Sequence, residues 1–205
     1  MTQTANPQSK PWDFDFRQPL PHQDSDLLEN LHFIPGLKEL LMLRQVHALE
    51  HATVWMLSAK SGNENHYDNE TLGGLSTEQG FYLYGEVSRY DLQRAVKLAL
   101  QRLKHGEWNL AVHPRCGTNL SVNMLLTAGL AFGVHLLLPR GLITQTIGLG
   151  LAAATAAQLT PDLGSWTQKY ITTSIPFNLE VEGITQKSDS WGRGAQFVQV
   201  RWKSV

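Results

Sequence analysis

One apolar stretch of the chain carries residues whose types and spacing suit a metal site. His47, Glu50 and His51 stand in the order His-Ala-Leu-Glu-His. Residues four apart project from the same face of a helix, so both imidazoles could bind one ion. The order His-x-x-Glu-His is the inverted zincin pattern, in which the glutamate can act as general base toward water. The motif therefore predicts metal ligands at His47 and His51, and a catalytic role for Glu50 in a metal-dependent hydrolase.

A second motif, His-Pro-Arg-Cys-Gly-Thr-Asn at 113–119, offers two more ligands. His113 and Cys116 are separated by two residues, which is a common gap in zinc sites. Pro114 and Gly117 predict a tight turn around them. Thiolate and imidazole together suit Zn, with Fe and Cu as further options. The two motifs together predict a tetrahedral set made of His47, His51, His113 and Cys116.

Two alternatives stay open at this point. Four side-chain ligands would close the coordination sphere and make the site structural, whereas a catalytic zinc keeps one position for water, and Cys116 decides between them. The motifs could also form a buried polar network without metal, in which Cys116 is a small apolar side chain and Thr118 or Asn119 caps the next helix. The function would then be that of a non-catalytic membrane scaffold or assembly factor.

The composition limits the classes of function. The chain has 205 residues, 17% charged residues, a net charge of −1 and one cysteine. An ordinary soluble domain has about 25% charged residues, so this chain either buries much surface or meets a membrane. Near-zero net charge argues against nucleic-acid binding, which needs a basic surface. One cysteine cannot form an internal disulfide.

Hydrophobic patterning predicts the elements that position the motifs. A helix over 35–58 carries the first motif, and a strand–helix–strand unit leads to the second. We expect an α+β fold, with packed helices on a small sheet of about four strands, at 81–87, 109–112, 177–182 and 197–202. Ser88 should cap a helix over 89–104. Residues 1–30 are rich in proline and polar residues and are predicted to be disordered, without a signal peptide.

Two stretches without Asp, Glu, Lys or Arg, 119–138 and 141–159, predict a transmembrane helical hairpin. Each has about the 20 residues that a helix needs to cross the bilayer core. Small residues four apart, at Gly129 and Gly133 and again at 148, 152 and 156, would let helices approach closely. A buried hairpin in a soluble protein is the alternative. The domain plan is therefore 1–30 disordered, 31–118 helix and strand–helix–strand unit, 119–160 hairpin, and 161–205 final strands.

Basic residues flank the hairpin at its two outer ends, at 102, 104, 115 and 169, and only Arg140 lies at its turn. This distribution predicts that both termini face the cytoplasm, at a plasma or thylakoid membrane. The expected partners are the lipid bilayer and either a second copy of the chain or another membrane protein, with no nucleic acid and an unidentified substrate.

These motifs also resemble a known family. Together with Gly-Phe-Tyr-Leu-Tyr-Gly at 80–85 and Arg-Leu-Lys-His-Gly-Glu at 102–107, they resemble domain-of-unknown-function family 6391, uncharacterised membrane proteins of photosynthetic prokaryotes and plastids. The resemblance covers about residues 40–203. The two motifs are also similar to a bacterial membrane family described as a predicted metal-dependent enzyme, although the residues at 52–54 differ from that family. The resemblance favours a metal and implies no substrate.

Overall fold

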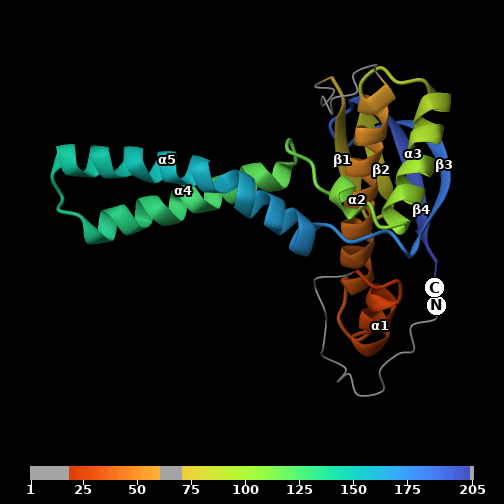
Figure 1. Ribbon diagram of the computed structural model, residues 1–205, viewed down its shortest axis with the longest axis horizontal. Coiled ribbons are helices and arrows are strands. Elements are labelled where there is room, and N and C mark those ends of the chain that lie inside the picture. The colour runs from red at the N-terminus through yellow and green to blue at the C-terminus, as the bar shows by residue number, and fades with distance from the viewer. Residues whose placement is uncertain (1–18, 61–70, 204–205) are drawn as a thin grey trace.

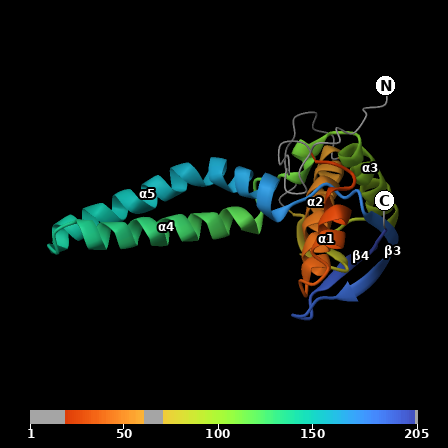
Figure 2. The same cartoon turned by 90° about the horizontal axis from the view of Figure 1, so that it is seen from below.

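The computed structural model describes residues 19–60 and 71–203. It shows a body of helices packed on a sheet, from which a long helical hairpin projects (Figure 1). Seen from below, the hairpin again extends away from the body and meets it only at its base (Figure 2). The helices of the body are α1 (Gln23–Asn30), α2 (Leu37–Lys60), α3 (Arg89–Lys104) and the short 3₁₀-helix η1 (Trp108–Ala111).

The sheet of the body has four antiparallel strands in the order β1-β2-β4-β3. They are β1 (Gly73–Thr77), β2 (Gly80–Tyr84), β3 (Leu179–Ser188) and β4 (Gly194–Trp202). The central pair joins segments far apart in the chain, because Phe81 of β2 pairs with Val198 of β4. The predicted α+β class with a four-stranded sheet is therefore confirmed. The sheet combines two strands that precede the hairpin in the sequence with two that follow it.

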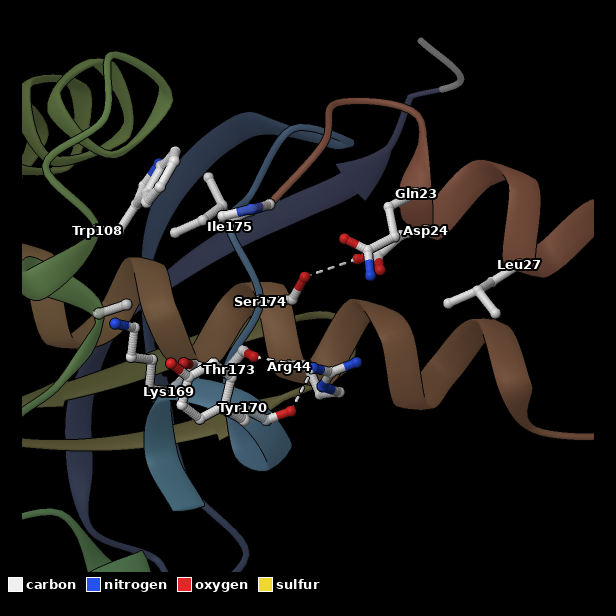
Figure 3. A pocket seen from close by; sticks show the side chains of 12 residues that line it. Gln23, Asp24, Leu27, Arg44, Trp108, Lys169, Tyr170, Thr173, Ser174 and Ile175 are labelled. Atoms are coloured by element: carbon white, nitrogen blue, oxygen red, sulfur yellow. Dashed lines mark hydrogen bonds between the residues drawn. The ribbon is translucent and has the colours of Figure 1, made fainter. Parts of the chain in front are cut away.

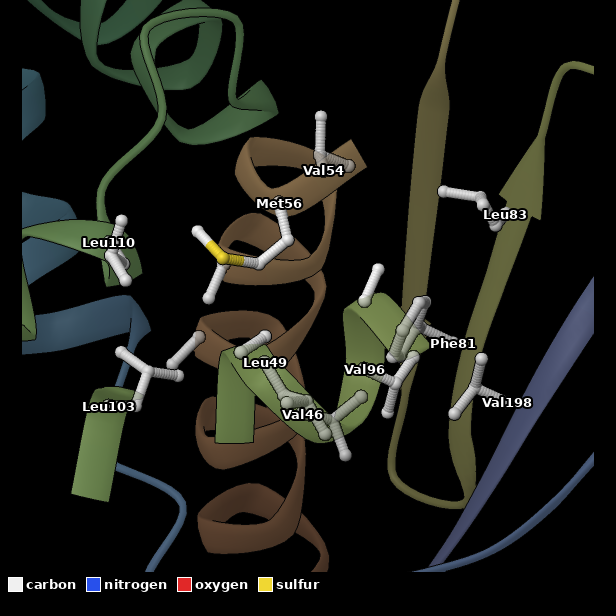
Figure 4. Close-up of a cluster of buried hydrophobic side chains, with 14 of the residues drawn as sticks. Val46, Leu49, Val54, Met56, Phe81, Leu83, Val96, Leu103, Leu110 and Val198 are labelled. Carbon is white, nitrogen blue, oxygen red and sulfur yellow. The ribbon is translucent and has the colours of Figure 1, made fainter. Parts of the chain in front are cut away.

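The core lies between α2, α3 and one face of the sheet. Val46 and Leu49 of α2 meet Val96 of α3, with Phe81 and Val198 of the sheet beneath them (Figure 4). Burying each such side chain contributes about 1.5–3 kcal/mol, so this packing holds α2 in place. Ser88 caps α3 as predicted, because its hydroxyl accepts a hydrogen bond from the amide of Asp91 at 3.1 Å.

The hairpin consists of α4 (Gly117–Leu137) and α5 (Leu142–Thr167), and α5 continues into the π-helix η2 (Gln168–Thr172). Both helices are long and apolar enough to cross a membrane, and none of the apolar window of α4 is buried. Gly148 of α5 faces α4 so closely that a Cβ atom there would lie 2.7 Å from Cγ1 of Val134. Gly129 and Gly133, by contrast, face open space. Within the described chain, the hairpin therefore lies largely outside the core of the body.

One predicted strand is absent, and a strand that was not predicted takes its place in the sheet. Residues 109–112 do not form a strand: η1 occupies most of this segment, because Leu110 and Val112 donate their amides back to Glu107 and Asn109. The fourth strand is instead β1, which lies next to β2. The chain enters η1 directly from a turn at Gly106, whose φ is +103°, so the segment is too tightly coiled to pair with the sheet.

Two predicted boundaries are also corrected. Residues 23–30 are not disordered but form α1, because the carboxylate of Asp24 accepts hydrogen bonds from Gln45 at 2.6 Å and Ser174 at 2.9 Å. Residues 1–18 lie outside the described part of the chain. The second hairpin helix does not end near residue 160 but runs through Pro161 to Thr167. A proline removes one helical hydrogen bond, and the helix continues because its far end is anchored by the buried Gln168.

Candidate metal site

Three of the four predicted ligands come together where α2 meets the start of α4. His47 and His51 lie one turn apart on α2, and Cys116 is the N-cap residue of α4. Their donor atoms all lie within 4.8 Å of one another, and Nε2 of His47 is 3.2 Å from Sγ of Cys116. Donors that share one tetrahedral zinc ion are roughly 3.3–3.8 Å apart, given bonds of about 2.0–2.3 Å. The group therefore needs only small side-chain movements to bind an ion.

The backbone sets which nitrogen of each imidazole can bind a metal. Nδ1 of His47 lies 3.1 Å from the carbonyl oxygen of Thr172, and Nδ1 of His51 lies 2.7 Å from that of Ala111. A carbonyl oxygen only accepts hydrogen bonds, so each Nδ1 carries a proton. In the neutral ring, which is the form that binds metal, the lone pair is therefore on Nε2, and in the protonated ring Nε2 carries a second proton. Metal-binding histidines are generally oriented by such a bond from their other nitrogen.

The surroundings of Cys116 favour its thiolate form. Its side chain is buried, which raises the pKa of the thiol, but a hydrogen bond with His51, the charge of His51 and the Thr118 amide together lower the pKa below its ordinary value. The Thr118 amide donates to Sγ at 3.4 Å, and this same bond caps α4. Cys116 therefore takes the capping role that the sequence suggested for Thr118 or Asn119, and a thiolate is the form that binds metal.

Glu50 lies in the same region, buried between α2 and β1. Its burial raises the pKa of the carboxyl group, although a hydrogen bond from Ser76 and the charge of His47 act in the opposite direction. The Ser76 hydroxyl donates to Oε2 at 2.5 Å. Carboxyl groups with raised pKa values can exchange protons near neutral pH, which general acid–base chemistry requires.

His113 is buried nearby but lies outside the group of donors. Its Nδ1 accepts a hydrogen bond from the Arg115 amide at 3.3 Å, so this nitrogen's lone pair is engaged. The ring lies between two others, with its centroid 4.7 Å from that of Trp55 and 5.7 Å from that of His51. Its role as a ligand stays a prediction.

A cavity of about 180 Å³ opens beside the group. Among the residues that line it are Glu50, His51, His113, Arg115 and Cys116. Sites for drug-sized ligands occupy roughly 300–1,000 Å³. The cavity can therefore take a small molecule or the reacting end of a larger one.

Several residues that hold the site carry no motif. The side chain of Gln168 is fully buried, accepts the His113 amide at 2.8 Å and donates to Asn119 Oδ1 at 2.8 Å. It thus joins the second motif to the end of the hairpin. Thr172 and Ala111 act through their carbonyl oxygens, which any residue could supply, so no sequence signal marks them. Gly74, which lies against the carboxyl group of Glu50, does carry a signal. Glycine inside a strand can indicate the close approach of another group.

Comparisons with known proteins identify the family of the chain. The family described as a domain of unknown function (DUF6391) matches residues 42–184, which include both motifs and the hairpin. This chain belongs to the DUF6391 family. An uncharacterized protein of the cyanobacterium Picosynechococcus sp. is 52% identical to it over 199 residues, 95% of this chain and 96% of the relative. No solved structure matches the chain. Similarity of the DUF6391 motifs to a metal-dependent enzyme family stays a prediction.

Proposed function

We propose that this DUF6391 protein is a membrane-anchored metalloprotein in which His47, His51 and Cys116 hold a zinc ion. One observation carries the proposal: both histidines donate Nδ1 to backbone carbonyls, which directs their Nε2 lone pairs to the donor group that includes Cys116. Imidazole nitrogen and thiolate are ligands that zinc prefers.

A three-residue set favours a catalytic site over a structural one. Structural zinc sites are almost always closed by four protein ligands, whereas catalytic sites have three and keep one position open. Zinc supplies Lewis acidity and lowers the pKa of water, and both assist hydrolysis. Glu50 lines the adjoining cavity and has a raised pKa, so we assign it the transfer of a proton between water and the leaving group. Ser76 orients its carboxyl group.

The hairpin is the proposed membrane anchor. Its outward side chains are large and apolar, for example Leu137 and Leu142, each 84% exposed. Such a surface is far more extended than the apolar patches of soluble monomers, and a bilayer would cover it. Two spans return the chain to its starting side, which fits a sheet made from both flanks. The basic residues at the outer ends of the hairpin support an orientation with the body on the cytoplasmic side.

Elemental analysis of the full-length protein tests the metal site. The protein is purified in detergent without chelator, as wild type and as the variants His47→Ala, His51→Ala and Cys116→Ser. We expect one zinc per chain in the wild type and a loss of metal in all three variants. His105→Ala is the matched control, because His105 is an exposed histidine bonded within its own helix terminus, and it should retain zinc.

Two further variants separate the parts of the proposal. His113→Ala should keep its zinc if three ligands suffice, and metal loss there would indicate a closed, structural site. Glu50→Gln should keep zinc and lose hydrolysis of small ester and amide substrates. A wild type that contains no metal and takes up no zinc on titration would contradict the proposal. The same residues would then be a buried polar network in a scaffold protein.

A further inference from the structure

A second cavity, of about 240 Å³, borders η2 and shares no lining residue with the cavity beside the metal site. It is enclosed by α1, α2, η1, η2 and the segment after η2, as Figure 3 shows. One part of its wall is apolar and includes Leu27, Trp108 and Ile175. Another part carries the cationic side chains Arg44 and Lys169. The cavity thus combines an apolar surface with positive charge.

Arg44 places a positive charge at the wall of this cavity. Its Nη2 donates to the carbonyl oxygens of Tyr170 at 3.3 Å and Thr173 at 3.1 Å. Its Nε is buried and has no hydrogen-bond partner within residues 19–60 and 71–203. Buried polar groups in proteins are nearly always paired, and an unpaired donor on a charged group is costly. Because Nε itself is out of reach, an anion in the cavity would meet the charge of the guanidinium, which is delocalised over its three nitrogens.

The acidic residue of the cavity, Asp24, is engaged in hydrogen bonds with other residues. The carboxylate oxygen Oδ2 of Asp24 already accepts hydrogen bonds from Gln45 and Ser174, which fix α1 to the body. Burial lowers the pKa of the Arg44 guanidinium, and the charge of Asp24 raises it only in part. With Arg44 and Lys169 against Asp24, the wall carries an excess of positive charge.

The cavity lies where the second apolar helix ends. Lys169 and Tyr170 belong to η2, which continues α5, and the Tyr170 ring lies 5.5 Å from that of Trp166. Trp166 is 54% exposed. Trp, Tyr and Lys at the end of a membrane helix are typical of the headgroup region of the bilayer. Short π-helical segments are rare and occur often at functional sites.

We propose that this cavity binds an anionic amphiphile, with a phosphate or carboxylate head on Arg44 and Lys169 and an apolar chain on Leu27, Trp108 and Ile175. Arginine binds such oxyanions well because its donors match their geometry. The volume fits a head and the first carbons of one chain, so the rest of the ligand extends outside. The source of the ligand is an anionic phospholipid of the surrounding bilayer, which rests on the proposed membrane anchor. The site itself is independent of the metal.

Binding of short-chain lipids to the detergent-purified full-length protein tests this site. The probes are dioctanoyl phosphatidylglycerol, dioctanoyl phosphatidylcholine and inorganic phosphate, measured by calorimetry. We expect phosphatidylglycerol to bind about tenfold or more tightly than phosphatidylcholine. Both lipids carry an anionic phosphodiester, but the choline cation of phosphatidylcholine cancels its charge and is repelled by Arg44 and Lys169. Inorganic phosphate should bind far more weakly, because it lacks the apolar part. Phosphate binding as tight as that of phosphatidylglycerol would overturn the amphiphile and indicate a soluble anion.

Variants locate the binding. Arg44→Gln should weaken phosphatidylglycerol binding about tenfold or more, and Lys169→Gln should weaken it less, because Lys169 is exposed. Leu27→Trp fills the cavity without removing a hydrogen bond and should block binding, so it decides the matter if Arg44→Gln fails to fold. Arg94→Gln, on the exposed face of α3, should bind as the wild type does. Unchanged binding in a folded Leu27→Trp protein would overturn the proposal.

Discussion

Gly74 lies against the carboxyl group of Glu50, so closely that a Cβ atom at residue 74 would overlap Oε1. The glycine is thus part of the site, because it leaves the space that the buried carboxyl group occupies. β1 supplies both this space and the hydroxyl of Ser76 that orients the carboxyl group.

Gly74→Ala should therefore displace Glu50 and destabilise the body by about 1–3 kcal/mol, the usual cost of overpacking. The zinc content should remain that of the wild type, since Glu50 is not a proposed ligand. Gly73→Ala is the matched control, because a Cβ atom there would lie 3.9 Å from the Tyr84 ring, an ordinary contact. Thermal unfolding measures the loss of stability, and elemental analysis measures the zinc content of both variants. If Gly74→Ala is as stable as Gly73→Ala, the predicted overlap with Glu50 is wrong.

Gln168 should be the most sensitive polar residue outside the motifs. Gln168→Ala removes the acceptor of the His113 amide and the donor to Oδ1 of Asn119. Each buried group left unpaired costs about 1–3 kcal/mol, so the variant should unfold at a clearly lower temperature. Gln101→Ala, on the exposed side of α3, should change stability by less than about 0.5 kcal/mol. A Gln168→Ala protein as stable as this control would show that the contact is dispensable.

Zinc should protect Cys116 from alkylation. The chain has one cysteine, so the incorporation of iodoacetamide, followed by mass spectrometry, reports on this thiol alone. Metal-bound thiolate is shielded, so adding Zn²⁺ to metal-free protein should slow the reaction by about tenfold or more, whereas Mg²⁺, which prefers oxygen ligands, should not. His47→Ala/His51→Ala should abolish the protection. Equal rates with and without zinc would argue against Cys116 as a ligand.

Asp189, in the turn between β3 and β4, should make the stability of the fold depend on pH below about pH 4. Burial raises the pKa of Asp189, but hydrogen bonds from Tyr84, from the amides of Arg193 and Trp191 and from the Arg193 side chain outweigh it and lower the pKa from 3.8 to about 2. Because the folded pKa is the lower one, the carboxylate stabilises the fold above about pH 4, and this contribution is lost as the pH falls toward 2.

Asp189→Asn should therefore lower the midpoint of thermal unfolding at pH 7, and its midpoint should fall less between pH 4 and pH 2 than that of the wild type. Unfolding curves across this range provide the measurement. Asp26→Asn, an exposed carboxyl group on α1, is the control and should follow the wild type. If the unfolding midpoints of Asp189→Asn and the wild type fall by the same amount between pH 4 and pH 2, Asp189 does not have this role.

The sequence predicts the elements whose own residues determine them. α3 has a cap and a clear apolar face, and the hairpin helices are uniformly apolar, so periodicity and composition are sufficient. β1 escapes prediction because Gly-Gly-Leu-Ser-Thr has low strand propensity, and its pairing with β2 and its contact with Glu50 favour the strand instead. α1 escapes it because its stability comes from Asp24, whose partners lie in distant segments.

In the metal site, too, local spacing predicts some residues and the fold determines the others. Spacing on one helix was enough to bring His47 and His51 together, because four residues make about one turn. Cys116 joins them through the fold, which places the start of α4 beside α2. His113 does not join the donor group, because ring orientation in a turn depends on local bonds such as the one from the Arg115 amide. Spacing carries no information about that bond.

The pairing of β2 with β4 imposes an order of events during synthesis. Phe81 leaves the ribosome long before its neighbour Val198, and the whole hairpin is made between them. If the hairpin enters the bilayer, one edge of β2 stays unpaired until both helices are inserted and β4 has been made. An unpaired strand edge is prone to bind other chains. In the proposed membrane-anchored protein, closure of the sheet is then the last step, and it takes place at the membrane surface where the hairpin entered.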